Sequence, residues 1–126
     1  MASAGTPKYL EKYDTLYMLV IAVNKYPGEN ALALPVKDAS DFRRQMQRIA
    51  NPTPGVAKLY ERPAVRILLD EEANQENIRA GLKWLKDNVK AKDAAVVFLA
   101  GHGTSLDQSY YFIPYRPGDV GRKEHW

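Results

Sequence analysis

No cysteine occurs among the 126 residues, and this absence excludes several classes of protein. Disulfide frameworks, cysteine-ligated zinc sites and thiol nucleophiles all require at least one cysteine. Long apolar runs are lacking too: the longest, Leu16–Val23 and Ala94–Ala100, are far too short to span a bilayer. The first 13 residues contain no apolar run like that of a signal peptide. We therefore expect a cytoplasmic protein with no membrane partner.

A large excess of charge of one sign is also missing. Eighteen Lys and Arg against fifteen Asp and Glu give a net charge of +3 and a pI near 9.1. The basic residues are spread along the chain, and no run of five like charges occurs. Since nucleic-acid binding needs a clustered basic surface, we expect no nucleic-acid partner.

The length and composition fit one globular domain. Apolar residues make up 45% of the chain and charged residues 26%, which are ordinary values for a globular protein. Residues 1–14 are polar and rich in small side chains, so we expect an N-terminal arm or the end of a linker there. The folded domain is predicted over residues 15–117, followed by a C-terminal tail at 118–126.

The apolar pattern predicts alternating strands and helices. Thr15–Val23 is apolar on both alternating faces, which is typical of a strand inside a covered parallel sheet. Ala94–Ala100 has the same pattern. Between and after these two strands the sequence predicts a helix at Val36–Ile49, a loop reaching Pro63, a strand at Ala64–Leu69, a helix at Gln75–Val89 capped by Asn74, and a strand at Tyr110–Pro114. The fold class is therefore α/β: a mostly parallel sheet flanked by helices, in the order β-α-β-α-β, with a terminal β-ribbon.

Three loops follow the carboxyl ends of the predicted parallel strands, where α/β proteins bind their ligands. The first, Asn24–Asn30, lacks a glycine-rich phosphate-binding motif, and we interpret its Pro27-Gly28 as a turn. The second, Asp70–Glu72, has carboxylates suited to a phosphoacceptor or a metal site, although acidic residues are also common where a helix starts. Overall we expect no cofactor and no metal ion.

The third loop, Gly101–Ser105, contains the most promising residue. A buried strand delivers His102 between two glycines, which leave room for a substrate beside the imidazole. An imidazole there can act as a general base near neutral pH, but the residues alone equally allow a histidine in a tight turn. Ser105 has no G-x-S-x-G context, so a serine nucleophile is not predicted. His125 lies in the basic tail and is interpreted as incidental.

Four segments at these spacings resemble the large-subunit half of the caspase-like cysteine peptidases, and most of all bacterial caspase and metacaspase homologues. The segments are Thr15–Tyr26, Leu34–Ala39, Val65–Leu82 and Asp93–Pro114. The resemblance covers about Leu16 to Pro117, and it implies a caspase-like fold that is incomplete at its C-terminal end. It also implies an endopeptidase that hydrolyses peptide bonds with a Cys-His dyad.

The resemblance assigns roles to three residues. His102 matches the histidine of the dyad, and Gly103 matches the glycine whose backbone N–H helps to form the oxyanion hole. Asp38 matches an acidic position that in metacaspases lines the primary specificity pocket and favours Arg or Lys. Asp38 is explained equally well as an acidic residue in the first turn of a helix.

The missing cysteine is a departure from the family. The nucleophile is expected roughly 50 residues after the histidine, but only 24 residues follow His102. One hypothesis is that the chain is part of a longer endopeptidase and is inactive alone. The other is a non-catalytic caspase-fold interaction module. Besides a peptide or protein substrate, we expect the missing small-subunit half as partner, or self-association through an open sheet edge at Ala94–Ala100.

Overall fold

The computed structural model describes residues 13–50, 54–55 and 58–116. Nearly all of the predicted arm at 1–14 and the tail at 118–126, with His125, lie outside these residues. The elements are β1 (Tyr13–Ala22), η3 (Gly28–Asn30), α1 (Pro35–Ala50), β2 (Tyr60–Leu69), η4 (Asp70–Glu72), α2 (Gln75–Asn88), β3 (Ala94–Ala100), β4 (Gly103–Leu106) and β5 (Ser109–Phe112). This order confirms the predicted α/β arrangement with a terminal ribbon.

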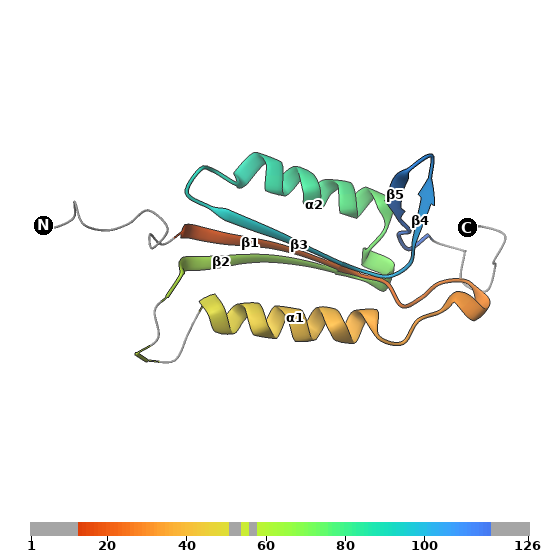
Figure 1. Cartoon of the computed structure of the whole chain (residues 1–126), viewed down its shortest axis with the longest axis horizontal. Helices are drawn as coiled ribbons and strands as arrows, with labels where there is room; N and C mark the ends of the chain where they lie inside the picture. The colour runs from red at the N-terminus through yellow and green to blue at the C-terminus, as the bar shows by residue number, and fades with distance from the viewer. Residues whose placement is uncertain (1–12, 51–53, 56–57, 117–126) are drawn as a thin grey trace, which may run out of the picture.

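The sheet is parallel, with strand order β2-β1-β3 and β1 at its centre. This central position agrees with the apolar residues on both faces of β1, because a helix covers each face of the strand (Figure 1). Its core side chains are fully buried: Leu16, Met18, Leu19, Val20 and Ile21. Each contributes about 1.5–3 kcal/mol to folding, so β1 is the main source of core stability.

Each helix covers one face of the sheet. On the α1 side, Phe42 stacks on Phe98 of β3 with ring centroids 4.6 Å apart. On the α2 side, Trp84 packs edge-on against Tyr17 of β1 at 5.4 Å. The predicted cap of α2 is confirmed, since the side chain of Asn74 accepts a hydrogen bond from the backbone N–H of Asn77 at 2.8 Å.

The predicted start of the second strand is wrong. The sequence suggested a loop up to Pro63, but β2 begins at Tyr60 and pairs with β1 along its whole length, with Pro63 opposite Leu16. A proline cannot donate a ladder hydrogen bond, yet it is tolerated on an edge strand when its nitrogen faces away from the sheet. In the described part of the chain β2 pairs with β1 alone and is an edge of the sheet, which is a position compatible with Pro63.

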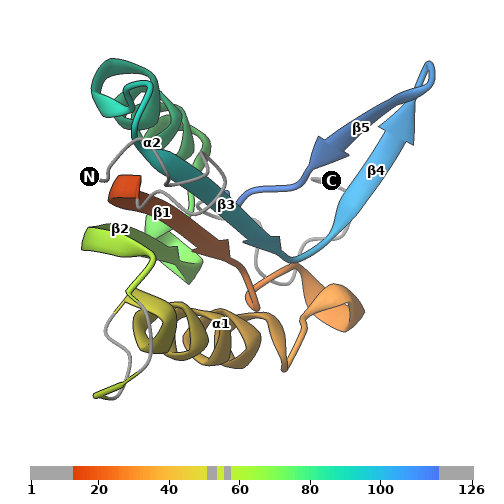
Figure 2. The ribbon, with the colours of Figure 1, turned by 60° about the vertical axis from the view of Figure 1, so that its left-hand side comes forward.

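A two-stranded antiparallel ribbon follows β3. Its strands β4 and β5 are joined by Asp107 and Gln108, whose φ values of 51° and 67° are those of a type I′ turn. Figure 2 shows the ribbon extending away from the sheet at the end of β3. The ribbon therefore leaves from the same edge at which the parallel strands end.

The outer side of β3 is less covered than β1. In the described part of the chain β3 pairs with β1 alone, and α2 packs over β1 and β2. As a result Val97 and Leu99 remain 43% and 48% exposed on the α2 side of the sheet. Among the described residues, no helix has the length and apolar character needed to cross a membrane.

Candidate active site

The three loops at the carboxyl ends of the parallel strands meet in one place. The loop after β1 reaches both of the others: Asn24 contacts Asp70 of η4, and Tyr26 and Asn30 contact His102, which follows β3. Residues 46 to 76 positions apart in the sequence are thus joined by hydrogen bonds. This convergence forms the candidate site.

The ring of His102 is half-buried and contacts the loop that follows β1. Its Nε2 lies 2.7 Å from the backbone carbonyl oxygen of Asn30, and the imidazole and the ring of Tyr26 pack in a T-shaped arrangement with centroids 4.7 Å apart. A carbonyl oxygen can only accept a hydrogen bond, so Nε2 carries the proton in this arrangement. In the neutral imidazole this tautomer has its basic lone pair on Nδ1.

The backbone of His102 is held by the hydroxyl group of Tyr26. The N–H of His102 donates to this hydroxyl at 3.0 Å, and the hydroxyl donates to the carbonyl of Ile113 at 2.6 Å. The N–H of Ile113 in turn donates to the carbonyl of His102 at 2.9 Å. The hydroxyl therefore bridges the N–H of His102 and the carbonyl of Ile113, which would bond to each other directly if the ladder of the ribbon continued to this pair. Burial raises the pKa of Tyr26 to about 12, so the hydroxyl keeps its proton near neutral pH.

At both glycines beside His102, Gly101 and Gly103, a Cβ atom would come too close to a neighbouring side chain. A Cβ at Gly101 would overlap the hydroxyl of Tyr26 and lie 3.1 Å from the ring of Phe112. A Cβ at Gly103 would overlap the end of the Tyr110 side chain, which is exposed and free to swing aside. The close approach at Gly101 is the stricter constraint, because Tyr26 is buried and hydrogen-bonded.

The carboxylates of Asp70 and Glu71 interact with the loop that follows β1. Oδ1 of Asp70 accepts hydrogen bonds from the backbone N–H groups of Asn24 at 2.8 Å and Lys25 at 3.1 Å. Glu71 forms an exposed ion pair with Lys25, whose hydrogen bond lowers the pKa of Glu71 and raises that of Lys25. No cluster of His, Cys, Asp or Glu suited to a metal ion occurs among the described residues.

Asp38 lies in the first turn of α1, with its side chain exposed. Within the described residues no hydrogen bond joins it to His102, although α1 follows directly on the loop that holds this histidine. Ser105 is exposed in β4, on the ribbon. The structure thus brings His102 and Gly103 to the centre of the site and leaves Asp38 on the adjoining helix.

Sequence reasoning missed the roles of three residues of the site. Tyr26 and Asn30 were placed in the loop after the first strand with no role of their own, and Asp70 was considered only as a phosphoacceptor or a metal-binding carboxylate. Gly28 does adopt a turn conformation, with φ of 51°. The available signal was position alone, because all three lie in loops at the carboxyl ends of parallel strands.

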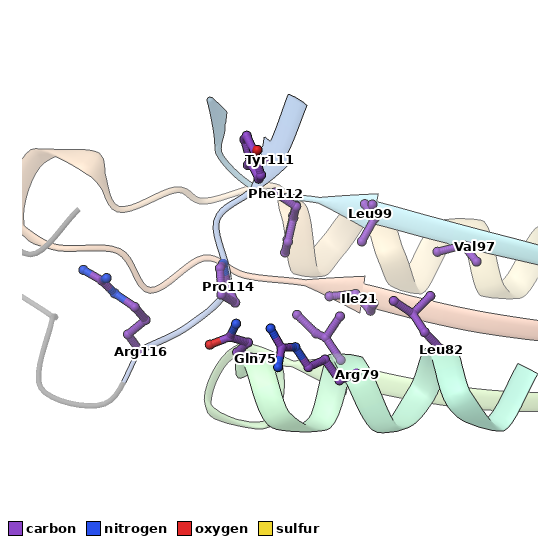
Figure 3. Close-up of a pocket in the computed structure, with 11 residues that line it drawn as sticks. Ile21, Gln75, Arg79, Leu82, Val97, Leu99, Tyr111, Phe112, Pro114 and Arg116 are labelled. Atoms are coloured by element: carbon purple, nitrogen blue, oxygen red, sulfur yellow. The ribbon is translucent and has the colours of Figure 1, made fainter. Parts of the chain in front are cut away.

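A groove lies next to the site, between α2, the ribbon and the face of β3 that lies on the α2 side of the sheet (Figure 3). Its volume is about 560 Å³. Leu82, Val97, Leu99 and Tyr111 give it apolar walls, and Arg79 and Arg116 lie towards one end. The groove runs along the strand edge that is unpaired in the described part of the chain.

Comparison with known proteins agrees with this architecture. A family model described as the caspase domain matches residues 15–120. No curated protein matches the chain. The match extends over most of the sequence and includes the parallel sheet, both helices and the ribbon. The chain belongs to the caspase family.

Proposed function

We propose that this chain is the histidine-bearing portion of a cysteine endopeptidase of the metacaspase type. The thiol would come from a segment outside these 126 residues, since they contain no cysteine. The observation that carries the proposal is the contact between His102 Nε2 and the Asn30 carbonyl. It fixes the ring in the tautomer whose Nδ1 is basic, at the edge where an α/β sheet places its chemistry.

In the proposed reaction His102 acts first as a base and then as an acid. Its ring takes the proton of the thiol, and the thiolate attacks the scissile carbonyl carbon. The imidazolium gives this proton to the leaving amine as the peptide bond breaks, which leaves an acyl-enzyme. Water then hydrolyses the acyl-enzyme, with the imidazole again serving as base.

Gly103 is suited to stabilise the oxyanion of this reaction. The ladder of the ribbon alternates, and the N–H of Ile113 bonds to the carbonyl of His102, so the next pair, Gly103 and Phe112, is a non-hydrogen-bonded pair. The N–H of Gly103 consequently points away from β5 and is not used by the ladder of the ribbon. A backbone N–H in an oxyanion hole contributes about 2.7–4 kcal/mol to transition-state stabilisation.

We also propose that the sheet is completed at β3. Among the described residues no strand pairs with the outer edge of β3, and this edge, with the exposed Val97 and Leu99 beside it, is the kind of surface that accepts a further strand. The missing small-subunit half, or a second copy of this chain, would supply it. The cytoplasmic location stays a prediction from the sequence.

The test compares His102→Ala with the unchanged residue in a complete protein that includes the downstream cysteine. We expect the substitution to abolish covalent labelling by an electrophilic peptide probe and to reduce peptide turnover by orders of magnitude. His102→Ala should leave the cooperative unfolding transition in place, which separates loss of chemistry from loss of fold. The 126-residue chain alone should be inactive with either residue.

Two results would contradict this function. Undiminished turnover in the His102→Ala protein would remove the histidine from the mechanism. If no reading frame downstream supplies a cysteine, the chain is instead a non-catalytic caspase-fold module, and binding of a protein partner becomes its function.

A further inference from the structure

Asp70 holds the loop after β1 from a different part of the chain. Its backbone has a φ of 48°, in the left-handed region, which directs the carboxylate back toward the end of β1. There Oδ1 accepts the N–H groups of both Asn24 and Lys25. One half-buried carboxylate oxygen thus fixes two consecutive peptide groups at the point where β1 ends.

Asn24, held by Asp70, in turn holds the rest of the loop. Its backbone carbonyl accepts the N–H of Leu32 at 2.8 Å, which closes the loop around Asn30. Its side-chain Oδ1 accepts the N–H of Val36 at 3.1 Å, in the first turn of α1. The position of the Asn30 carbonyl therefore depends on Asn24, and the position of Asn24 depends on Asp70.

We propose that Asp70 is a positioning residue for His102, acting through Asn24 to aim the Asn30 carbonyl at Nε2. Asp70 does not touch the imidazole and would not touch a substrate. Its effect is to keep the ring in one tautomer and orientation by preventing the loop from moving away. This inference rests on the proposed role of His102, but its consequence for the ring is measurable without any thiol.

The experiment uses the 126-residue chain with ¹⁵N-labelled histidine and follows the exchange of the His102 Nε2 proton with solvent by NMR. His102→Gln assigns the signal against His125, because the chain has only two histidines. Asp70→Gly removes the carboxylate while accepting the left-handed φ. We expect it to raise the exchange rate on the order of tenfold or more, as for loss of a charge-assisted hydrogen bond.

Two variants serve as controls. Asp70→Asn keeps a neutral oxygen acceptor at the same position and tolerates the left-handed φ, so the ring-proton exchange rate should lie between those of the unchanged chain and Asp70→Gly. Glu71→Gln removes the neighbouring exposed ion pair with Lys25 and should have no effect. Backbone amide protection at Val20 in β1 reports whether the fold is intact.

An unchanged ring-proton rate in Asp70→Gly, with Val20 still protected, would overturn the proposal and leave the proposed endopeptidase function untouched. A general loss of protection would transfer the test to Asp70→Ser, whose hydroxyl oxygen lies one bond short of the Oδ1 position and so loses the hydrogen bonds to Asn24 and Lys25. An unchanged rate in that folded variant would overturn the proposal equally. Failure of the His102→Ala test in the complete protein would instead remove the endopeptidase function, whatever the ring proton does here.

Discussion

The hydroxyl of Tyr26 accepts a hydrogen bond from the backbone N–H of His102 at 3.0 Å, across 76 positions of sequence. The same hydroxyl donates to the carbonyl of Ile113 at 2.6 Å. Tyr26 thus joins the end of β1 to both sides of the ribbon that follows β3. Because one buried side chain satisfies two backbone groups, it fixes where the chain turns at His102.

Tyr26→Phe should destabilise the fold without leaving a large cavity. The substitution deprives the N–H of His102 and the carbonyl of Ile113 of their partner, which costs about 1–3 kcal/mol for partly buried groups. Urea unfolding measures this loss as a lower midpoint with an unchanged slope. Tyr111→Phe is the matched control, since Tyr111 is exposed, and its change should stay within about 0.5 kcal/mol. Equal effects of the two substitutions would contradict the bridging role.

Stability should also fall at alkaline pH because of Tyr26. Burial raises the pKa of Tyr26 from its ordinary value of 10.0 to about 12. The unfolded chain therefore ionises first as the pH rises, so stability is fully present below pH 10 and is lost progressively towards pH 12. Lys25 and Lys37, whose ion pairs raise their pKa values, act in the same direction. The decline should accordingly be shallower, but still present, in Tyr26→Phe; identical slopes would contradict the assignment.

The sequence predicted the layers of this fold well because the layers depend on local patterns. Thr15–Val23 was expected to be a central strand, and β1 lies at the centre of the sheet with both faces buried. The bounds Ala94–Ala100 of β3 agree residue for residue. The presence of Pro63 led to a predicted start of β2 that is too late. A proline is tolerated in an edge strand, but the sequence does not show which strand lies at an edge.

The site was less predictable, since its contacts are long-range. His102 and its glycines were identified, but nothing local indicates that Tyr26 and Asn30 reach His102 or that Asp70 reaches Asn24. These contacts exist because parallel strands bring their carboxyl ends to one edge of the sheet. The roles assigned to His102, Gly103 and Asp38 stay predictions.

Gly101→Ala should be more damaging than Gly103→Ala to the stability of the fold. A methyl group at Gly101 meets the buried hydroxyl of Tyr26 and the ring of Phe112, whereas one at Gly103 meets the exposed end of Tyr110. We expect a cost of about 1–3 kcal/mol at Gly101 and a smaller one at Gly103. Thermal unfolding of the two variants side by side gives the comparison. A reversed order would show that the space around Gly101 adapts more easily than the contacts indicate.

The specificity hypothesis concerns Asp38 and requires the active parent protein. A carboxylate lining the substrate pocket would favour Arg or Lys before the scissile bond, through a charge-assisted contact. Asp38→Ala should then reduce kcat/KM for such substrates by about tenfold or more in a fluorogenic panel. Asp41→Ala is the matched control, because Asp41 lies one turn further along α1 and pairs with Lys37 and Arg44. A preference for aspartate, or equal effects of both substitutions, would mark Asp38 as a helix-start residue.

The 126-residue chain should self-associate through β3. Its outer edge is unpaired within the described residues, and Val97 and Leu99 present an apolar surface beside it, so a strand from a second copy can extend the sheet. Light scattering coupled to size exclusion should show a mass that rises with concentration above 14.2 kDa. Val97→Lys places a charge on this surface and should shift the chain toward the monomer, whereas Leu59→Lys, at an exposed position before β2, should not. A mass of 14.2 kDa at every concentration, with cooperative unfolding, would show that the ribbon of β4 and β5 or other parts of the chain protect the edge.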